Sequence, residues 1–205
     1  MKKSLASIIP LIFPTFLGLL STLGMGVDLY AGTIEGKVTA YGVKDPRDTV
    51  IYIDKIEGET FAPPAEPRVL NQLNKEFVPH VLPLLKGGSV NFVNGDSFLH
   101  NIHAYFERKT LFNFGMPLEG QQITRTFDQA GKVVVLCDVH QEMSAYIIVI
   151  ETPYVDVSDE EGRYQIADIP AGNYTLKTWH EKLEPASKAV TVPDQGVIEV
   201  NLELR

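Results

Sequence analysis

One short stretch of the chain concentrates side chains that bind metals. It reads Cys137-Asp-Val-His140-Gln-Glu-Met143, so a thiol, an imidazole and a thioether follow one another at intervals of three residues. The stretch comes directly after an apolar run from Lys132 to Leu136 that is typical of a strand. A tight loop at the end of a strand can turn successive side chains toward one point. This loop therefore indicates a metal site.

Thiolate, thioether and imidazole together are a donor set that copper accepts. Two histidines and one cysteine in a plane, with a weak axial methionine, form the arrangement of electron-transfer copper sites. The loop supplies three of these four ligands, so a second histidine must come from another part of the chain. The stretch Asn94-Gly-Asp-Ser-Phe-Leu-His100-Asn101-Ile-His103 offers two candidates. Residues three apart on a strand face opposite sides, so we expect only one of these two histidines to reach the metal unless the strand bulges.

These two stretches resemble the cupredoxin, or blue copper, family, which includes amicyanin and plastocyanin. In that family the upstream ligand is a histidine followed by asparagine, and a strand that begins with glycine ends in Cys-x2-His-x2-Met or a longer form. Gly131 begins such a strand here, and the loop matches the shorter, amicyanin-like form. The resemblance implies that Asn101 ties the two ligand loops together and donates a hydrogen bond near the sulfur, and it makes His103 only the alternative ligand. The copper ligands that it implies are His100, Cys137, His140 and Met143.

The composition narrows the classes of protein further. The chain has 205 residues, of which 44% are hydrophobic and 21% are charged, the balance of a folded globular protein. Its 26 acidic and 18 basic residues give a net charge of -8, which does not favour nucleic acid as a partner. Cys137 is the single cysteine in the sequence, and this excludes an intrachain disulfide and any cysteine-rich zinc or iron–sulfur site.

The first 31 residues have the features of an export signal peptide. Lys2 and Lys3 precede an uncharged apolar run from Leu5 to Val27, and the small residue Ala31 offers a cleavage position. The run is also long enough to act as an uncleaved membrane anchor. In both cases we expect the remainder of the chain to be periplasmic or otherwise extracytoplasmic, with membrane contact only through this segment.

Apolar and polar residues alternate with a period of two in several stretches beyond residue 32, and no stretch has convincing helical periodicity. Short β-branched and aromatic runs bounded by Gly, Pro, Asn or Asp indicate further strands. We therefore predict an all-β protein built from packed antiparallel sheets. The expected strands cover residues 33–40, 49–53, 78–85, 89–94, 102–106, 132–137, 145–150, 172–179 and 199–205.

The C-terminal part resembles a second family. Its stretches Asp159-Glu-Glu-Gly162-Arg-Tyr164 and Ile169-Pro-Ala-Gly172-Asn-Tyr are similar to motifs of the carboxypeptidase regulatory-like, or transthyretin-like, β-sandwich. The opening strands of that fold are similar to residues 32–38 and 49–53. We therefore expect a cupredoxin Greek-key sandwich over residues 65–152, inserted into a small transthyretin-like sandwich made of residues 32–60 and 154–205. The alternative is that the first strand pair belongs to the cupredoxin, and a separate small domain follows it.

Together these features predict an exported type 1 copper protein that carries one electron and is not an enzyme. The expected partner is a redox protein, such as a c-type cytochrome or an oxidoreductase. One alternative is a copper carrier or sensor without an electron-transfer role, and another is a metal-free structural or binding sandwich. A multicopper oxidase or a copper nitrite reductase would need further histidine clusters and a longer chain, and a binuclear copper site would need a second cysteine.

Overall fold

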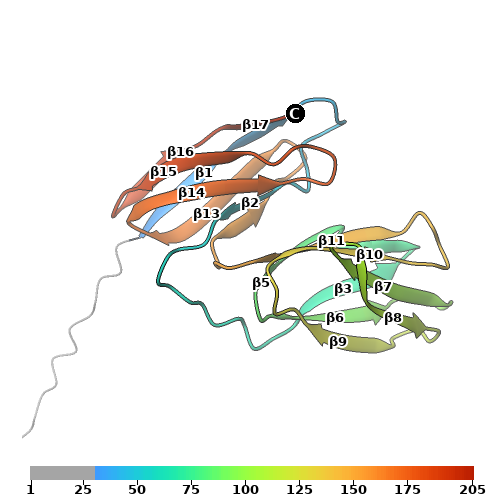
Figure 1. The fold of residues 1–205 in the computed structure, drawn as a ribbon. Coiled ribbons are helices and arrows are strands. Elements are labelled where there is room, and N and C mark those ends of the chain that lie inside the picture. Colours follow the sequence, from blue (N-terminus) through green and yellow to red (C-terminus); the bar gives the residue numbers. More distant parts are fainter. Residues whose placement is uncertain (1–30) are drawn as a thin grey trace, which may run out of the picture.

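The computed structural model describes residues 31–205, and these residues form strands and connecting segments without a helix (Figure 1). This confirms the predicted all-β class. The strands, in chain order, are β1 (Ala31–Ala40), β2 (Val50–Ile53), β3 (Arg68–Leu73), β4 (Glu76–Val78), β5 (Val81–Leu85), β6 (Ser89–Asn94), β7 (His100–Phe106), β8 (Lys109–Met116), β9 (Gln122–Thr126), β10 (Gly131–Leu136), β11 (Ser144–Ile150), β12 (Val155–Val157), β13 (Arg163–Pro170), β14 (Gly172–Trp179), β15 (Ser187–Val192), β16 (Gly196–Glu199) and β17 (Leu202–Leu204).

Strands β3 to β11 form two sheets, which we call the inner sandwich. One sheet has the order β4-β3-β6-β9 and the other the order β5-β11-β10-β7-β8. Side chains from both sheets, such as Phe92 and Ile147, are fully buried in a shared hydrophobic core. Strands β10 and β11 pair antiparallel, and their register ends with Leu136 opposite Ser144. Residues 137–143 are therefore a short hairpin connection between two neighbouring strands at the edge of a packed core.

The other eight strands form the outer sandwich, which combines residues from before and after the inner one (Figure 1). One of its sheets has the order β13-β1-β16, with β17 also paired to β1, and the other has the order β12-β2-β14-β15. The backbone N–H of Ile53 donates to the carbonyl of Tyr154, and the buried hydroxyl of Thr152 donates to the carbonyl of Ile53. The chain thus leaves and re-enters the outer sandwich at one place. Strand pairing alone does not define independently folding units, so the domain limits given above stay a prediction.

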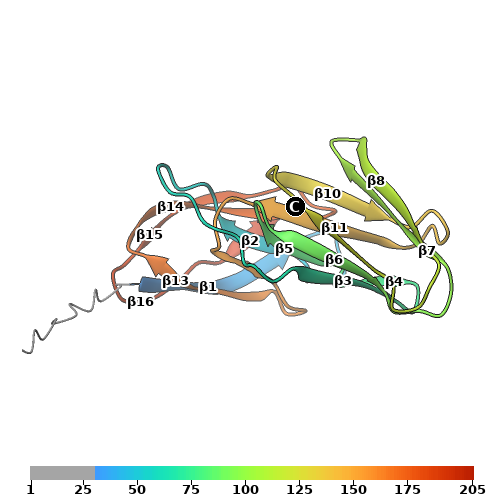
Figure 2. The same ribbon diagram turned by 90° about the horizontal axis from the view of Figure 1, so that it is seen from below.

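The two sandwiches lie against each other in both views (Figures 1 and 2). A hydrophobic cluster between them joins Val81 and Ile148 of the inner sandwich to Val50 of the outer sandwich. At its edge the rings of Tyr146 and Trp179 lie with their centroids 5.0 Å apart. Burial of apolar surface stabilises such a contact in proportion to the area removed from water.

The strand predicted over residues 78–85 is wrong in its extent. The structure divides this stretch into β4, which ends at Val78, and β5, which begins at Val81. Pro79 lies between them and has no N–H to donate to a sheet. The expected ranges also omit the strands β3, β8, β9, β12, β13 and β15, and they cover β4 only at Val78 and β16 only at Glu199; all of these except β3 lie at sheet edges. Strand β4 has only three residues, and in β8 and β9 exposed residues alternate with half-buried ones such as Phe112 and Ile123, which pack against the core.

The expected leader, residues 1–31, lies outside the described residues except for its last residue, Ala31, which begins β1. Within the part of the chain that is described, no helix is long and apolar enough to cross a membrane.

Candidate metal centre

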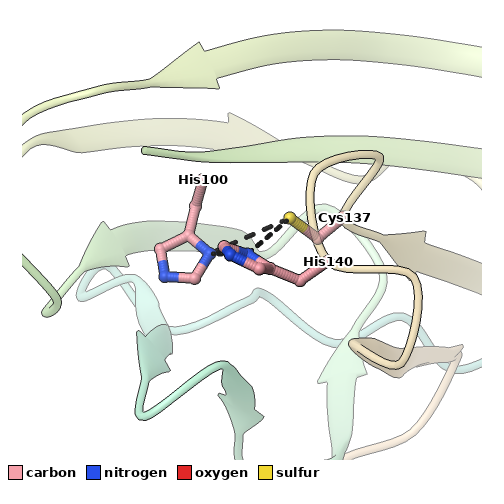
Figure 3. Close-up of side chains that lie close together, drawn as sticks. All are labelled: His100, Cys137 and His140. Carbon is pink, nitrogen blue, oxygen red and sulfur yellow. Dashed lines mark hydrogen bonds between the residues drawn. The ribbon is translucent and has the colours of Figure 1, made fainter. Parts of the chain in front are cut away.

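Three side chains that could bind a metal converge at one end of the inner sandwich. His100 is the first residue of β7, Cys137 directly follows β10, and His140 lies in the loop that begins with this cysteine. Since β7 and β10 are paired, their adjoining ends place His100 next to the loop. Figure 3 shows the sulfur and the two imidazole rings pointing toward one another. Among the described residues, His100, Cys137 and His140 form a group of three side chains close enough together to bind one metal ion.

The size of this triangle fits a metal ion. Each Nδ1 atom, of His100 and of His140, lies 3.8 Å from the sulfur of Cys137, and the two Nδ1 atoms lie 3.2 Å apart. A point equidistant from the three atoms is about 2.1 Å from each, close to the metal–nitrogen and metal–sulfur bond lengths of about 2.0–2.3 Å. The three donor atoms therefore surround a space that one transition-metal ion would occupy.

A buried carboxylate fixes the orientation of His100. Oδ2 of Asp96 lies 2.9 Å from Nε2 of His100, and both side chains are buried. Burial alone would raise the pKa of Asp96, but hydrogen bonds from the backbone N–H groups of Asn74 and Lys75 and from His100 outweigh it and lower this pKa. An ionised carboxylate can only accept, so Nε2 carries the proton and Nδ1 directs its lone pair at the centre.

Water has little access to two of the three donors. His100 is 0% exposed and Cys137 is 3% exposed, whereas His140 is only partly buried. The ring of Phe98 lies beside both imidazoles, with centroid distances of 5.0 Å to His100 and 5.6 Å to His140. The centre is therefore shielded on the core side and approaches the surface at His140.

Met143 is placed by the backbone of the loop. It is 2% exposed and belongs to the same hydrophobic cluster as Cys137. Its N–H donates to the carbonyl of His140, and its own carbonyl accepts from the N–H of Cys137. These two bonds close the loop upon itself. The thioether is thus a buried residue of the ligand loop, and its role as an axial ligand stays a prediction.

Asn101 ties the strand of His100 to the loop of Cys137. Oδ1 of Asn101 accepts from the N–H of Asp138 at 2.6 Å, and Nδ2 donates to the carboxylate of Asp138 at 3.0 Å and to Oδ1 of Asn113 at 2.9 Å. The side-chain N–H groups are directed at these two oxygens. The side chain of Asn101 thus links β7 to the first residue after Cys137, and a hydrogen bond from Asn101 near the sulfur stays a prediction.

The remaining histidines lie elsewhere. His103, the alternative ligand, is on the opposite side of β7, where Nδ1 lies 3.0 Å from the carboxylate of Asp138. His80 contacts Glu181 and the carbonyl of Ser144. His180 is buried and accepts a hydrogen bond from the N–H of Lys182. Of the two upstream candidates, the structure brings His100 and not His103 to Cys137 and His140.

The residues that support the centre were not predicted from the sequence. Asn94 and Asp96 form a turn in which the N–H of Asp96 donates to Oδ1 of Asn94. The amide group of Asn94 then donates to the carbonyls of Phe98 and Met116. A sequence signal for this turn exists, because Asn and Asp near Gly commonly form such side-chain-to-backbone turns. It does not reveal that Asp96 reaches back to His100.

Comparisons with known proteins give partial likenesses. No protein-family model matches the chain, and no curated protein matches it. Among solved structures, a mutant of amicyanin in the oxidised state is 21% identical over 40% of this chain and 81% of its own, with a TM-score of 0.38. A purple cupredoxin from Nitrosopumilus maritimus is 20% identical over 40% of this chain and 98% of its own, with a TM-score of 0.36. A copper-containing nitrite reductase from Thermus scotoductus SA-01 is 22% identical over 56% of this chain and 28% of its own, with a TM-score of 0.38. At these values the likenesses carry no weight for function, which is inferred from the side chains of the centre.

Proposed function

We propose that this protein is a type 1 copper protein that carries single electrons outside the cytoplasm. The observation that carries the proposal is the convergence of one thiol and two imidazole nitrogens, with His100 held by Asp96 so that its lone pair faces the other two donors. This donor set is the equatorial plane of electron-transfer copper sites. His100, Cys137 and His140 would hold the ion, and Met143 would be a fourth, weaker ligand.

Copper, when bound, supplies a one-electron couple between Cu(I) and Cu(II). The protein contributes a fixed ligand geometry, because the donors lie on paired strands and on a short loop closed by backbone hydrogen bonds. Burial of His100 and Cys137 excludes water from the centre. A rigid, dry site requires little rearrangement when the charge changes, and such preorganisation favours electron transfer over ligand exchange.

His140 is the proposed point of electron exchange with a partner. It is only partly buried, and the side chains of Val139 and Phe98 next to it are 46% and 39% exposed. An apolar surface around an exposed ligand would suit a brief contact with another redox protein, such as a c-type cytochrome or an oxidoreductase. The proposal assigns no catalytic residue. It also retains the expectation that the N-terminal segment directs the chain to the periplasm or cell surface.

Copper reconstitution tests the proposal. The purified protein is loaded with Cu(II), and its visible and electron paramagnetic resonance spectra are recorded. We expect an intense thiolate-to-copper band and a small hyperfine splitting, both abolished in Cys137→Ser. A colourless wild-type product would refute the proposal. Reversible voltammetry would support a carrier, whereas a blue protein without reversible electron exchange would support copper storage.

The two candidate histidines provide a second test. We expect His100→Gly to abolish the thiolate-to-copper band, because this substitution removes a nitrogen from the triangle. The matched variant His103→Gly should keep the band, since His103 faces Asp138 instead. Loss of the band only in His103→Gly would show that the ligand assignment is wrong.

A further inference from the structure

The contact between the two sandwiches reaches the loop that carries the proposed ligands. Glu181 belongs to the outer sandwich and lies in the segment that follows β14. Its Oε2 atom lies 2.8 Å from Nε2 of His80, a residue of the inner sandwich. The other ring nitrogen of His80, Nδ1, lies 3.0 Å from the backbone carbonyl of Ser144. One imidazole thus connects a carboxylate of the outer sandwich to the first residue of β11.

Ser144 directly follows Met143 and stands opposite Leu136 in the β10–β11 register. The loop of residues 137–143 is closed on the inside by the hydrogen bond from the N–H of Cys137 to the carbonyl of Met143. The bond from His80 therefore holds the next carbonyl along the chain. Displacing Ser144 would displace the end of the loop on which Met143 lies.

Both bonds of His80 require its ring to donate. A backbone carbonyl and a carboxylate are both acceptors, so the two bonds form together when both ring nitrogens carry protons. Burial alone would raise the pKa of Glu181, but hydrogen bonds from Lys182 and His80 outweigh it and hold this pKa below its usual value. Glu181 is thus a charged acceptor, and its side chain is only 17% exposed. Charge-assisted bonds of this kind are stronger and shorter than neutral ones.

The surrounding contacts keep the imidazole in place. The carbonyl of His80 accepts from the N–H of Tyr146, and the ring of Tyr146 meets the ring of His80 edge to face, with centroids 5.5 Å apart. Tyr146 in turn packs against Trp179 of the outer sandwich. His80 is thus positioned from both sandwiches.

We propose that the outer sandwich positions the ligand loop of the copper centre, with Glu181 acting through His80 on the carbonyl of Ser144. Glu181 and His80 are positioning residues in this scheme, since neither belongs to the converging donors. This inference rests on the proposed copper function. It gives the outer sandwich a specific role: removing the Glu181 carboxylate alters the coordination and redox behaviour of a centre built wholly within the other sandwich.

The test compares three variants of the copper-loaded full chain. Glu181→Ala removes the acceptor, Glu181→Gln keeps a neutral acceptor, and Glu184→Gln changes an exposed carboxylate on the same segment. We expect Glu181→Ala to shift the thiolate-to-copper band and the reduction potential. We also expect copper release to a chelator to become on the order of tenfold faster, the lower end of the effect of losing an outer-shell partner. Glu181→Gln should lie between Glu181→Ala and the wild type, and Glu184→Gln should match the wild type.

An unchanged band, potential and release rate in a folded Glu181→Ala protein would overturn the inference. If this variant does not fold, Glu181→Gln decides in the same way. A wild-type protein that forms no thiolate-to-copper band refutes the copper function instead. The inference about the loop is then tested by the methyl resonance of Met143 in the metal-free protein. A shift of this resonance in Glu181→Ala but not in Glu184→Gln supports the positioning role, and no shift overturns it.

Discussion

The contact between Asp96 and His100 leads to a quantitative prediction for Asp96→Asn. The carboxylate accepts three hydrogen bonds, at 2.8 Å from the N–H of Asn74, at 3.1 Å from the N–H of Lys75 and at 2.9 Å from Nε2 of His100. An asparagine side chain presents one acceptor oxygen and one NH2 group at the same two positions. Two responses are possible: the NH2 group faces the N–H of Asn74, or it faces the N–H of Lys75 and Nε2 of His100, and the ring of His100 then changes its tautomer so that Nε2 accepts.

The second response places a proton on Nδ1 of His100, the atom that faces Cys137. A protonated nitrogen cannot bind a metal ion, so copper binding must first reverse the change. A hydrogen bond to a charged group contributes about 1.5–3 kcal/mol, and loss of an outer-shell partner weakens metal affinity about 10- to 100-fold. A tenfold change in affinity corresponds to about 1.4 kcal/mol, so the two ranges agree. We expect the Cu(II) dissociation constant of Asp96→Asn to rise about 10- to 100-fold.

Competition titration with a chelator measures this constant. The matched control is Asp128→Asn, which changes an exposed carboxylate of the same sandwich. We expect the control to bind Cu(II) as the wild type does. If Asp96→Asn is folded and its dissociation constant lies within about twofold of the wild-type value, orientation of His100 by Asp96 does not contribute to binding, and the reasoning from outer-shell partners is refuted.

Three further predictions concern stability of the copper-free protein. Burial lowers the pKa of His180 below its usual value of 6.5. The unfolded chain therefore binds the proton more readily than the folded chain, and the free energy of unfolding falls as the pH drops below about 6.5. His180→Gln should flatten the decline in urea midpoint between about pH 8 and pH 5, and an equal slope in both proteins would contradict this. Tyr164→Phe removes a buried bond of 2.6 Å to the carbonyl of Val200, and denaturant unfolding should show a loss of about 1–3 kcal/mol, whereas an unchanged midpoint would argue against it. Gly36→Ala places a methyl group onto the same carbonyl oxygen and should cost about 3 kcal/mol or more, so a thermal midpoint equal to that of the wild type would show that the strand yields easily.

Local patterns made part of the centre predictable from the sequence. Cys137, His140 and Met143 lie within seven residues, so the loop can be recognised without knowledge of the fold. The opposite orientation of His100 and His103 follows from strand geometry alone. The all-β class follows from the many period-two stretches.

Contacts that depend on the fold could not be predicted from local sequence patterns. A carboxylate four residues before His100 has many possible positions, and only the turn at Asn94 directs Asp96 back to the imidazole. Glu181 and His80 are 101 residues apart, and nothing in either local sequence indicates that they meet. In β8 the apolar residues Phe112, Phe114 and Met116 alternate with Asn113 and Gly115, so a period-two signal was present although this strand was not predicted; β9 has a single apolar residue, Ile123, and carries no such signal.

The hydrogen bonds of Ile53 with Thr152 and Tyr154 join the two ends of the segment that forms the inner sandwich, and this bears on the order of folding. Strand β2 pairs with β12 across an intervening segment of about 100 residues, and closing an unstructured loop of that length costs about 4 kcal/mol of chain entropy. Folding of the inner sandwich removes most of this cost, because it brings the ends of the segment together in advance. The outer sheets should therefore be completed last, and substitutions that slow formation of the inner core should delay the assembly of the whole chain.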